Sequence, residues 1–198
     1  MTSLSTNDGI VAVKTARCVI TQEVTKERTA YMMHFPYTEK CGVFVTINKF
    51  PSLNLRGCIG FIEPLYELPY ALEHAARSAC HDPRFQSLKK SELDNVVVEV
   101  TILTRPERII VKEKKELLNE IIIGKHGLLL EYKDRRSVFL PQVPEEWNWN
   151  VTEYLENLCM KAGISKDKWK DDECEISSFE GRIFKETTPS GDIIEVKE

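Results

Sequence analysis

The chain has 198 residues, 42% of them hydrophobic, and a net charge of −4 at pH 7. A chain of this length can bury a hydrophobic core without disulfide bonds, as one domain or as two small lobes. Its 27 basic and 31 acidic residues are interspersed. Since binding to nucleic acid needs clustered lysine and arginine, we do not expect a nucleic-acid partner.

The sequence also argues against a membrane protein and against a bound metal or cofactor. It contains no run of about 18 apolar residues, the length that crosses a bilayer, and we expect no signal peptide. The six cysteines are scattered without the CxxC spacing of zinc or redox sites, and no nucleotide-binding glycine motif is present. We therefore expect a cytoplasmic protein with reduced thiols, no metal and no cofactor.

The first predicted elements are a helix and a β-hairpin. Apolar residues at helical spacing predict a helix over residues 8–28, with its N-cap within the segment NDG that begins at Asn7. Two segments with alternating apolar residues follow, at 43–47 and 53–62, and the turn between them carries Pro51. This pattern predicts an antiparallel hairpin whose second strand is LNLRGCIGFI.

The second strand of the hairpin carries the first candidate site residues. In a regular pleat Arg56 and Cys58 lie on one face, and a cation beside a thiol favours the reactive thiolate. Gly57 and Gly60 indicate a bulge or a close approach by backbone or ligand. The alternative is that Cys58 is a small buried hydrophobic residue and that Arg56 forms an ordinary salt bridge.

A helix and a polar turn follow the hairpin. Small and apolar residues recur at spacings of three and four over residues 68–80, which predicts a helix that packs against a sheet. The segment HDPRF then places His81, Asp82 and Arg84 within four residues of one another. Asp-Pro is typical of turns. These three side chains either belong to a site or are surface charges on a capped loop.

The second half of the chain alternates between strand and helix patterns. We expect the following elements and ranges: a strand at 95–103, a charged helix at 107–120, three strands separated by two turns at 121–140, a helix at 151–162, a strand at 174–184, and a poorly fixed tail at 187–198.

Two short segments of this half carry further candidates. Glycines bracket Lys125 and His126, so both side chains project from a tight loop, although a plain meander needs the same glycines. Trp147 and Trp149 lie in a proline-rich stretch, where large aromatic rings cover apolar area or line a groove.

Six blocks of the sequence together resemble one known family. The blocks are LRGCIG, ALEHAARSACHDPRF, SELDNVVVEVTIL, IGKHGLLL, LPQVPEEWNW and ENLCMKAG. In this order they resemble the AMMECR-one domain family, named for the Alport syndrome, midface hypoplasia and elliptocytosis chromosomal region, over residues 8–186. The resemblance implies an α+β fold of two lobes, discontinuous in sequence, with mainly antiparallel sheets, flanking helices and a cleft bordered by the LRGCIG strand.

Two functions remain open at this point, and we favour the first. In the first, the chain is a binding or regulatory module for a small molecule or a protein, and the family resemblance implies Memo-like and radical-SAM-like partners. Its ligand-binding residues are then Arg56, Gly57, Gly60, Asp82, Arg84, Lys125 and Trp147.

The second function is that of an enzyme or an enzyme subunit acting on a small or peptide-bound substrate. Cys58 is then a nucleophile or acid–base group, Arg56 anchors an anionic group, and His126 or His81 moves protons. Both functions rest on one expectation about geometry: Arg56, Cys58, Asp82, Arg84 and His126 converge around one concavity.

Overall fold

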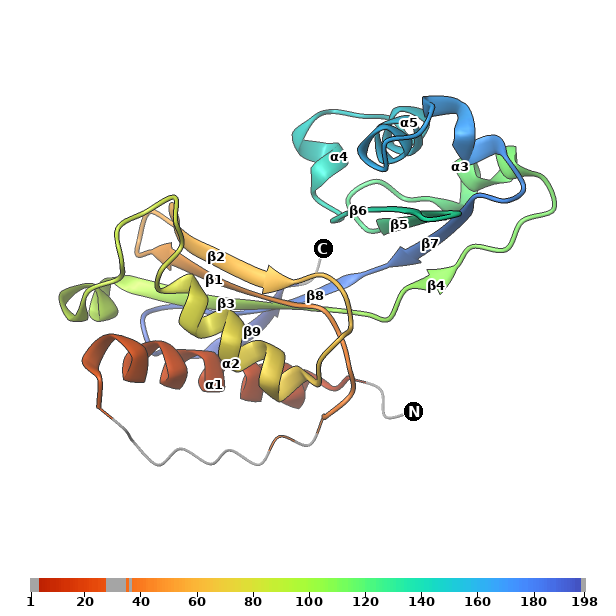
Figure 1. Ribbon diagram of the computed structural model, residues 1–198. Coiled ribbons are helices and arrows are strands. Elements are labelled where there is room, and N and C mark those ends of the chain that lie inside the picture. The colour runs from red at the N-terminus through yellow and green to blue at the C-terminus, as the bar shows by residue number, and fades with distance from the viewer. Residues whose placement is uncertain (1–3, 28–34, 36, 197–198) are drawn as a thin grey trace. The chain divides into compact units, whose positions relative to one another are not determined.

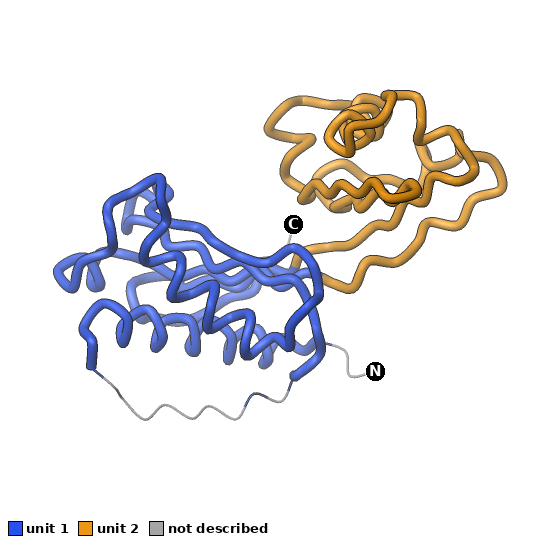
Figure 2. The backbone as a smooth tube through the Cα atoms, viewed as in Figure 1, with its two compact units in different colours: residues 1–103, 182–198 blue, residues 104–181 orange. Residues whose placement is uncertain are grey.

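The computed structural model describes residues 4–27, 35 and 37–196. The chain forms two compact units (Figure 2). Unit 1 comprises Met1–Leu103 together with Arg182–Glu198, and unit 2 comprises Thr104–Gly181. Unit 1 is therefore built from two separate stretches of the sequence, with unit 2 inserted between them.

Unit 1 contains a five-stranded sheet in the order β2-β1-β3-β8-β9. Its strands are β1 (Val43–Lys49), β2 (Leu55–Phe61), β3 (Val96–Leu103), β8 (Gly181–Glu186) and β9 (Ile193–Val196). The predicted hairpin is present as the antiparallel pair β1 and β2, and β2 forms one edge of the sheet. β9 lies in the segment after residue 186, for which a poorly fixed tail is expected.

Helices α1 (Thr6–Thr25) and α2 (Leu68–Ala79) cover one face of this sheet (Figure 1). The N-cap predicted within NDG is wrong. Ser5 caps α1 instead: its Oγ accepts from the backbone N–H of Asp8 at 3.2 Å, and Asp8 Oδ2 accepts from the N–H of Ser5 at 2.8 Å. This reciprocal capping box satisfies N–H groups that a helix start leaves unpaired. Residue 28, the last of the predicted helix, lies outside the described residues.

The core of unit 1 is formed by apolar residues that alternate along the strands and recur at helical spacing in α2. Val43, Val45 and Ile47 of β1 are fully buried, as are Leu68 and Leu72 of α2. Burying a side chain of this size stabilises the fold by about 1.5–3 kcal/mol. Because β2 pairs with β1 on both sides of Arg56, this core also fixes the position of β2.

Unit 2 contains a four-stranded sheet in the order β4-β7-β5-β6, with its own hydrophobic core. Its regular elements are β4 (Glu107–Arg108), α3 (Leu117–Glu120), β5 (Gly127–Tyr132), β6 (Arg135–Phe139), α4 (Val143–Glu146), α5 (Val151–Lys161) and β7 (Glu175–Phe179). The described residues also include the 3-10 helices η1 (Lys90–Asn95) in unit 1 and η2 (Lys114–Glu116) and η3 (Lys166–Lys170) in unit 2.

Three predicted elements of this region are wrong. The charged segment 107–120 is not one helix, because the backbone N–H of Ile109 bonds to Ile176 O at 2.9 Å and draws the segment beside β7. Residues 121–123 form no strand, since His126 N donates to Ile122 O at 3.0 Å and closes a turn. The strand expected at 174–184 is two strands in different sheets, separated at Glu180.

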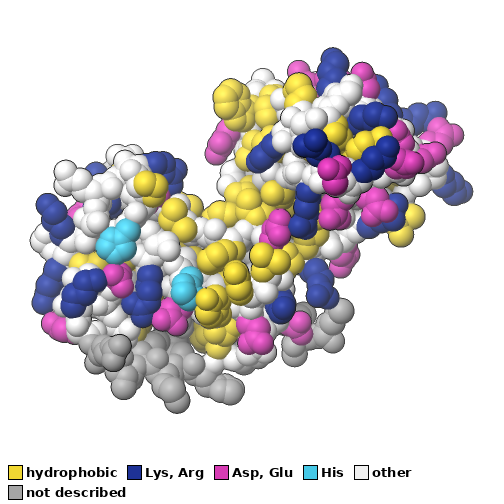
Figure 3. Space-filling view, viewed as in Figure 1, with side chains coloured by type: hydrophobic (Ala, Val, Ile, Leu, Met, Phe, Trp, Pro, Cys, Tyr) yellow, Lys and Arg dark blue, Asp and Glu magenta, His cyan; other side chains and the backbone are white. Residues whose placement is uncertain are grey.

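Two antiparallel sheets flanked by helices confirm the predicted α+β class. Over the described residues, none of the helices combines the length and the apolar character needed to cross a membrane. Basic and acidic side chains are interspersed on the visible face of each unit (Figure 3).

Candidate functional site

The LRGCIG segment forms β2, and we refer to this strand as the signature strand. Its pairing with β1 is interrupted: Gly57 lies opposite Ile47, but Leu55 lies opposite Asn48, so Arg56 is an extra residue. Such a bulge bends a strand and redirects its side chains. The regular pleat expected to place Arg56 beside Cys58 is therefore absent at this point.

Arg56 points into a fixed ion pair. Its Nε and Nη2 bond to the two carboxylate oxygens of Glu92 at 2.8 and 3.0 Å, and only 7% of Arg56 is exposed. This bidentate contact, strengthened by the Lys89 backbone N–H, lowers the pKa of Glu92. The guanidinium carbon lies 6.0 Å from the centre of the Phe85 ring. Arg56 thus occupies the position of a salt-bridge partner.

The turn after α2, residues 80–85, holds the outer edge of the signature strand, and we refer to it as the clamp turn. Asp82, 2% exposed, accepts from the backbone N–H of Cys58 at 2.9 Å through Oδ2 and from that of Arg84 at 3.0 Å through Oδ1. Arg84 Nη2 lies 2.7 Å from Asp82 Oδ2 and donates to Cys58 O at 3.2 Å. The Arg84 contact and the two backbone donors hold the pKa of Asp82 well below its usual range. Because β2 is an edge strand, this Asp82–Arg84 clamp satisfies backbone groups that no further strand pairs.

The two glycines of the signature strand allow close packing. A Cβ on Gly57 would lie 2.4 Å from the carbonyl oxygen of Ala79, at the end of α2. A Cβ on Gly60 would lie 2.3 Å from Val43 O and 2.5 Å from the ring of Phe44. The close approach indicated by the sequence is therefore made by the protein's own backbone and by an aromatic ring.

Cys58 is a half-buried thiol. Its Sγ accepts a hydrogen bond from Thr46 Oγ1 at 3.2 Å. Burial raises the pKa of Cys58, and this effect outweighs the opposing Thr46 hydrogen bond and the positive charge of Arg84. The thiol is consequently protonated near neutral pH, unlike an activated nucleophile.

Sequence reasoning missed two neighbours of Cys58. Thr46 lies directly opposite Cys58 and also opposite Glu99 of β3, so the three residues form a row across three strands. Burial raises the pKa of Glu99, and the charge of Lys185 opposes this shift. The register of the three strands, once known, is the signal that identifies this row.

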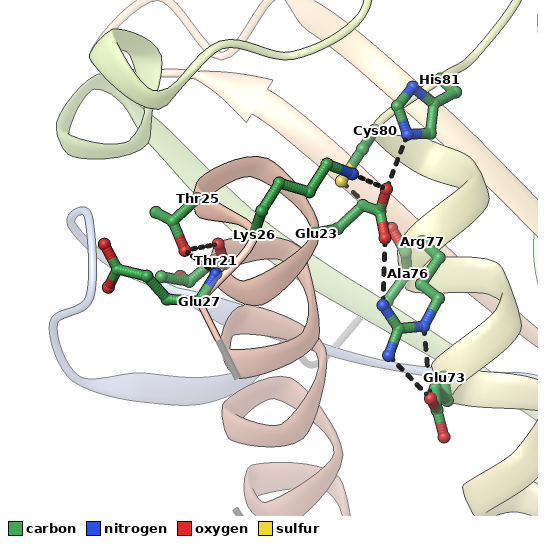
Figure 4. A network of polar contacts seen from close by, with 10 residues as sticks. All are labelled: Thr21, Glu23, Thr25, Lys26, Glu27, Glu73, Ala76, Arg77, Cys80 and His81. Carbon is green, nitrogen blue, oxygen red and sulfur yellow. Dashed lines mark hydrogen bonds and ion pairs between the residues drawn. The ribbon is translucent and has the colours of Figure 1, made fainter. Parts of the chain in front are cut away.

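His81 belongs to a cluster that joins α1 to α2 (Figure 4). Its Nδ1 lies 3.1 Å from Ser87 Oγ and its Nε2 lies 3.1 Å from Glu23 Oε1. Glu23 also contacts Lys26 at 2.7 Å and Arg77 at 3.0 Å. The contacts with Lys26, His81 and Arg77 lower the pKa of Glu23 to about 2. Both ring nitrogens of His81 are therefore engaged, Nε2 with α1 and Nδ1 within the segment that follows α2.

A surface concavity borders the signature strand. It has a volume of about 460 Å³ and lies beside the Glu23–His81 cluster. Its lining consists of Glu23, Ile59, Arg77, Ser78, His81 and Pro83. Of these residues, Ile59 comes from the signature strand, and His81 and Pro83 come from the clamp turn.

The remaining candidates lie in unit 2. Lys125 Nζ lies 3.2 Å from Glu180, and His126 Nδ1 accepts from the backbone N–H of Ile122 at 3.2 Å. Trp147 is 67% exposed. In unit 1 Asp82 and Arg84 contact the backbone of Cys58, whereas Arg56 is directed to Glu92. None of these predicted residues lines the concavity, and their convergence with His126 around one concavity stays a prediction.

The part of the chain that the structure describes holds no group of three or more His, Cys, Asp or Glu side chains arranged to bind a metal ion. Its cysteines are all free thiols.

Comparison with known proteins places this arrangement in a family. The AMMECR1 family model matches residues 13–184, which include the signature strand, the clamp turn and all of unit 2. The chain belongs to the AMMECR1 family. The resemblance of the six sequence blocks to this family is thereby confirmed.

Relatives with similar sequences cover most or all of this chain. Protein MJ0810 of Methanocaldococcus jannaschii is 44% identical and covers 100% of this chain and 99% of its own. A protein of Aquifex aeolicus is 46% identical over 79% of this chain and 80% of its own. The crystal structure of the uncharacterized protein PH0010 from Pyrococcus horikoshii is 38% identical, with a TM-score of 0.77 over 98% of this chain and 99% of its own.

Proposed function

We propose that this AMMECR1-family chain is a binding module, and that its ligand or partner occupies the concavity beside the signature strand. The observation that carries this proposal is the contact between the Asp82 carboxylate and the backbone N–H of Cys58. This contact uses the most buried acidic group of the predicted site to fix the strand.

Other polar groups of the predicted site in unit 1 support the same conclusion. Arg56 is paired with Glu92, and both nitrogens of His81 are engaged. Cys58 has a raised pKa. General acid–base or nucleophilic catalysis needs a group that is free to exchange protons with a substrate. These contacts instead build a rigid frame, which favours binding because little conformational entropy is lost when a partner docks.

The concavity offers mixed chemistry to a ligand. Ile59 and Pro83 supply apolar contacts, the Ser78 hydroxyl supplies a hydrogen-bond donor, and Glu23 and Arg77 supply an ion pair. A small molecule or protein segment with an apolar group beside a polar group matches this lining. The family resemblance implies Memo-like and radical-SAM-like proteins as partners, and the free thiols support a cytoplasmic setting.

Co-expression with the Memo-like and radical-SAM-like proteins of the same genome tests this proposal. We expect a complex that survives size-exclusion chromatography. Ser78→Phe fills the concavity and should abolish the complex, whereas Ser91→Phe, at an exposed position of η1, should retain it. A complex that tolerates Ser78→Phe, or no complex with the wild-type chain, contradicts the proposal.

One observation favours the alternative that the chain is an enzyme. Cys58, Thr46 and Glu99 place a thiol, a hydroxyl and a carboxyl in one row on the sheet face opposite the buried face of β1. A carboxyl with a raised pKa is a feature of general acids. In that alternative Cys58 is the nucleophile or acid–base group, and selective reactivity of its thiol is the decisive property.

A further inference from the structure

The turn after α4 holds one tryptophan outward on the support of another. Trp147 is 67% exposed, whereas Trp149 is partly buried against the core of unit 2. The two rings are stacked, with centroids 6.1 Å apart and planes at 19°. Trp149 in turn meets the ring of Phe139 edge-on at 5.6 Å. The exposed Trp147 ring is therefore supported by the partly buried rings of Trp149 and Phe139.

Backbone hydrogen bonds fix this turn. Trp147 N donates to Val143 O at 3.2 Å, and Trp149 N donates to Pro144 O at 2.8 Å. Between them Asn148 adopts a positive φ of 53°, a conformation that asparagine tolerates better than most residues. The position of the exposed ring is thus set by its turn. Exposed, rigidly held tryptophans are typical of interaction hot spots.

Two acidic residues directly precede the exposed ring in the sequence. Glu145 and Glu146 directly precede Trp147, are both exposed, and form no ion pair with any residue of the described ranges. The Glu145 carboxylate lies against the loop at Gly124, where an added Cβ would meet its Oε1 at 2.5 Å. At least one of the two charges is therefore held in a defined place.

The same aromatic cluster already accommodates an ammonium group. Lys161 Nζ lies 4.3 Å from the centre of the Phe139 ring and donates to Val138 O at 2.8 Å. A cation at this distance from an aromatic face is attracted by the electron density of the ring, and tryptophan attracts a cation more strongly than phenylalanine does.

We propose that Glu145, Glu146 and Trp147 form a docking site for a lysine- or arginine-bearing segment of a partner protein. The ring face attracts the cation, and the two unpaired carboxylates select a basic segment over an acidic or a purely apolar one. This site lies in unit 2 and uses none of the residues that line the concavity, so it goes beyond the function proposed above.

An NMR titration with a hexaarginine peptide tests the proposal on the full chain. The chain has three tryptophans, so the indole N–H signals of Trp147, Trp149 and Trp169 report directly on the site. We expect a saturable shift of the Trp147 signal and none of the buried Trp169 signal. Binding should weaken as salt rises through 0.1 M, because exposed charges are screened.

Variants separate the site from general acidity. We expect Trp147→Ala to weaken hexaarginine binding about fivefold, and Trp147→Phe to weaken it less. Glu145→Gln combined with Glu146→Gln should weaken it by a similar factor. Glu107→Gln removes one charge from an exposed position of β4 in the same unit and should leave binding unchanged.

Four outcomes would overturn the proposal. They are the absence of a saturable Trp147 shift, an equal shift with hexaglutamate, weakening by Glu107→Gln as large as that of the double variant, and a concentration-dependent Trp147 shift without peptide. The last outcome would assign the surface to a second copy of this chain.

Discussion

At the scale of single residues, Asp82 and Cys58 show that side chains of types common in active sites can instead have a structural role. A carboxylate that accepts from two backbone N–H groups and from Nε and Nη2 of an arginine is stabilised in its charged form. A thiol that is half-buried beside a hydroxyl is stabilised in its neutral form. Each residue holds the protonation state that suits a fixed contact.

The Cys58 thiol should react slowly. With iodoacetamide at neutral pH, we expect no preference for Cys58 over partly exposed Cys18, because burial raises the pKa of both thiols. Modification should accelerate in denaturant, and in the native protein its rate should still be rising with pH beyond about 8.5, where an ordinary thiol is half ionised. Site-resolved mass spectrometry measures this, with fully buried Cys159 as the slow reference. Rapid labelling of Cys58 alone would favour the enzyme.

Asp82→Asn should destabilise unit 1 by about 2–3 kcal/mol at pH 7, because it removes a buried charge-assisted contact. The folded-state pKa of Asp82 is lowered, so its stabilisation is present above the unfolded pKa of about 3.9 and is lost as pH falls toward the folded pKa. Urea unfolding at several pH values should therefore show a wild-type advantage that shrinks below pH about 4. Asp134→Asn, at an exposed position, is the control. A stability difference between the wild type and Asp82→Asn that is the same at pH 3 as at pH 7 would contradict this role of the Asp82 charge.

At the scale of elements, the sequence predicts what depends on periodicity and fails where a contact between distant segments decides. The hairpin β1–β2 and the apolar face of α2 follow from spacing alone. The bulge at Arg56 and the clamp by Asp82 depend on register and on a turn 24 residues away. Ile121, Ile122 and Ile123 satisfy a strand pattern, yet local hydrogen bonds to His126 turn them.

Gly57→Ala tests the contact between the signature strand and α2. The added methyl group would lie 2.4 Å from Ala79 O, and relief requires backbone movement, so we expect a loss of about 3 kcal/mol in unfolding free energy. At Gly163 an added Cβ would lie 3.9 Å from Arg135 Nη1, an ordinary contact, but φ is 73°, so Gly163→Ala should cost about 1 kcal/mol. Chemical denaturation of both variants gives the comparison. If both variants lose the same unfolding free energy, the contact between the signature strand and α2 can adjust to an added methyl group at little cost.

At the scale of the whole molecule, unit 1 depends on the C-terminal strands. β8 supplies Phe184, which is fully buried against Gly9 of α1, and Glu186, which pairs with Arg17. β8 also lies between β3 and β9 within the sheet. The last stretch of the chain is thus part of the core of unit 1.

Truncation after Glu180 should unfold unit 1 and leave unit 2 folded, because unit 2 has its own core. Backbone NMR spectra should keep dispersed signals for unit 2 and lose those of unit 1. Truncation after Glu186 removes only the edge strand β9 and should cost much less. A truncated chain that retains dispersed signals for β1, β2 and β3 would contradict this expectation.

The split of unit 1 around unit 2 also sets an order of events on the ribosome. The ribosome synthesises all of Thr104–Gly181 before Phe184. Unit 2 can therefore fold while β3 is paired with β1 but still lacks β8 on its other side. Until translation ends, the nascent chain exposes an unpaired strand edge above an incomplete core. A chaperone that shields this edge should therefore matter more for the yield of this protein than for a domain read from one continuous stretch.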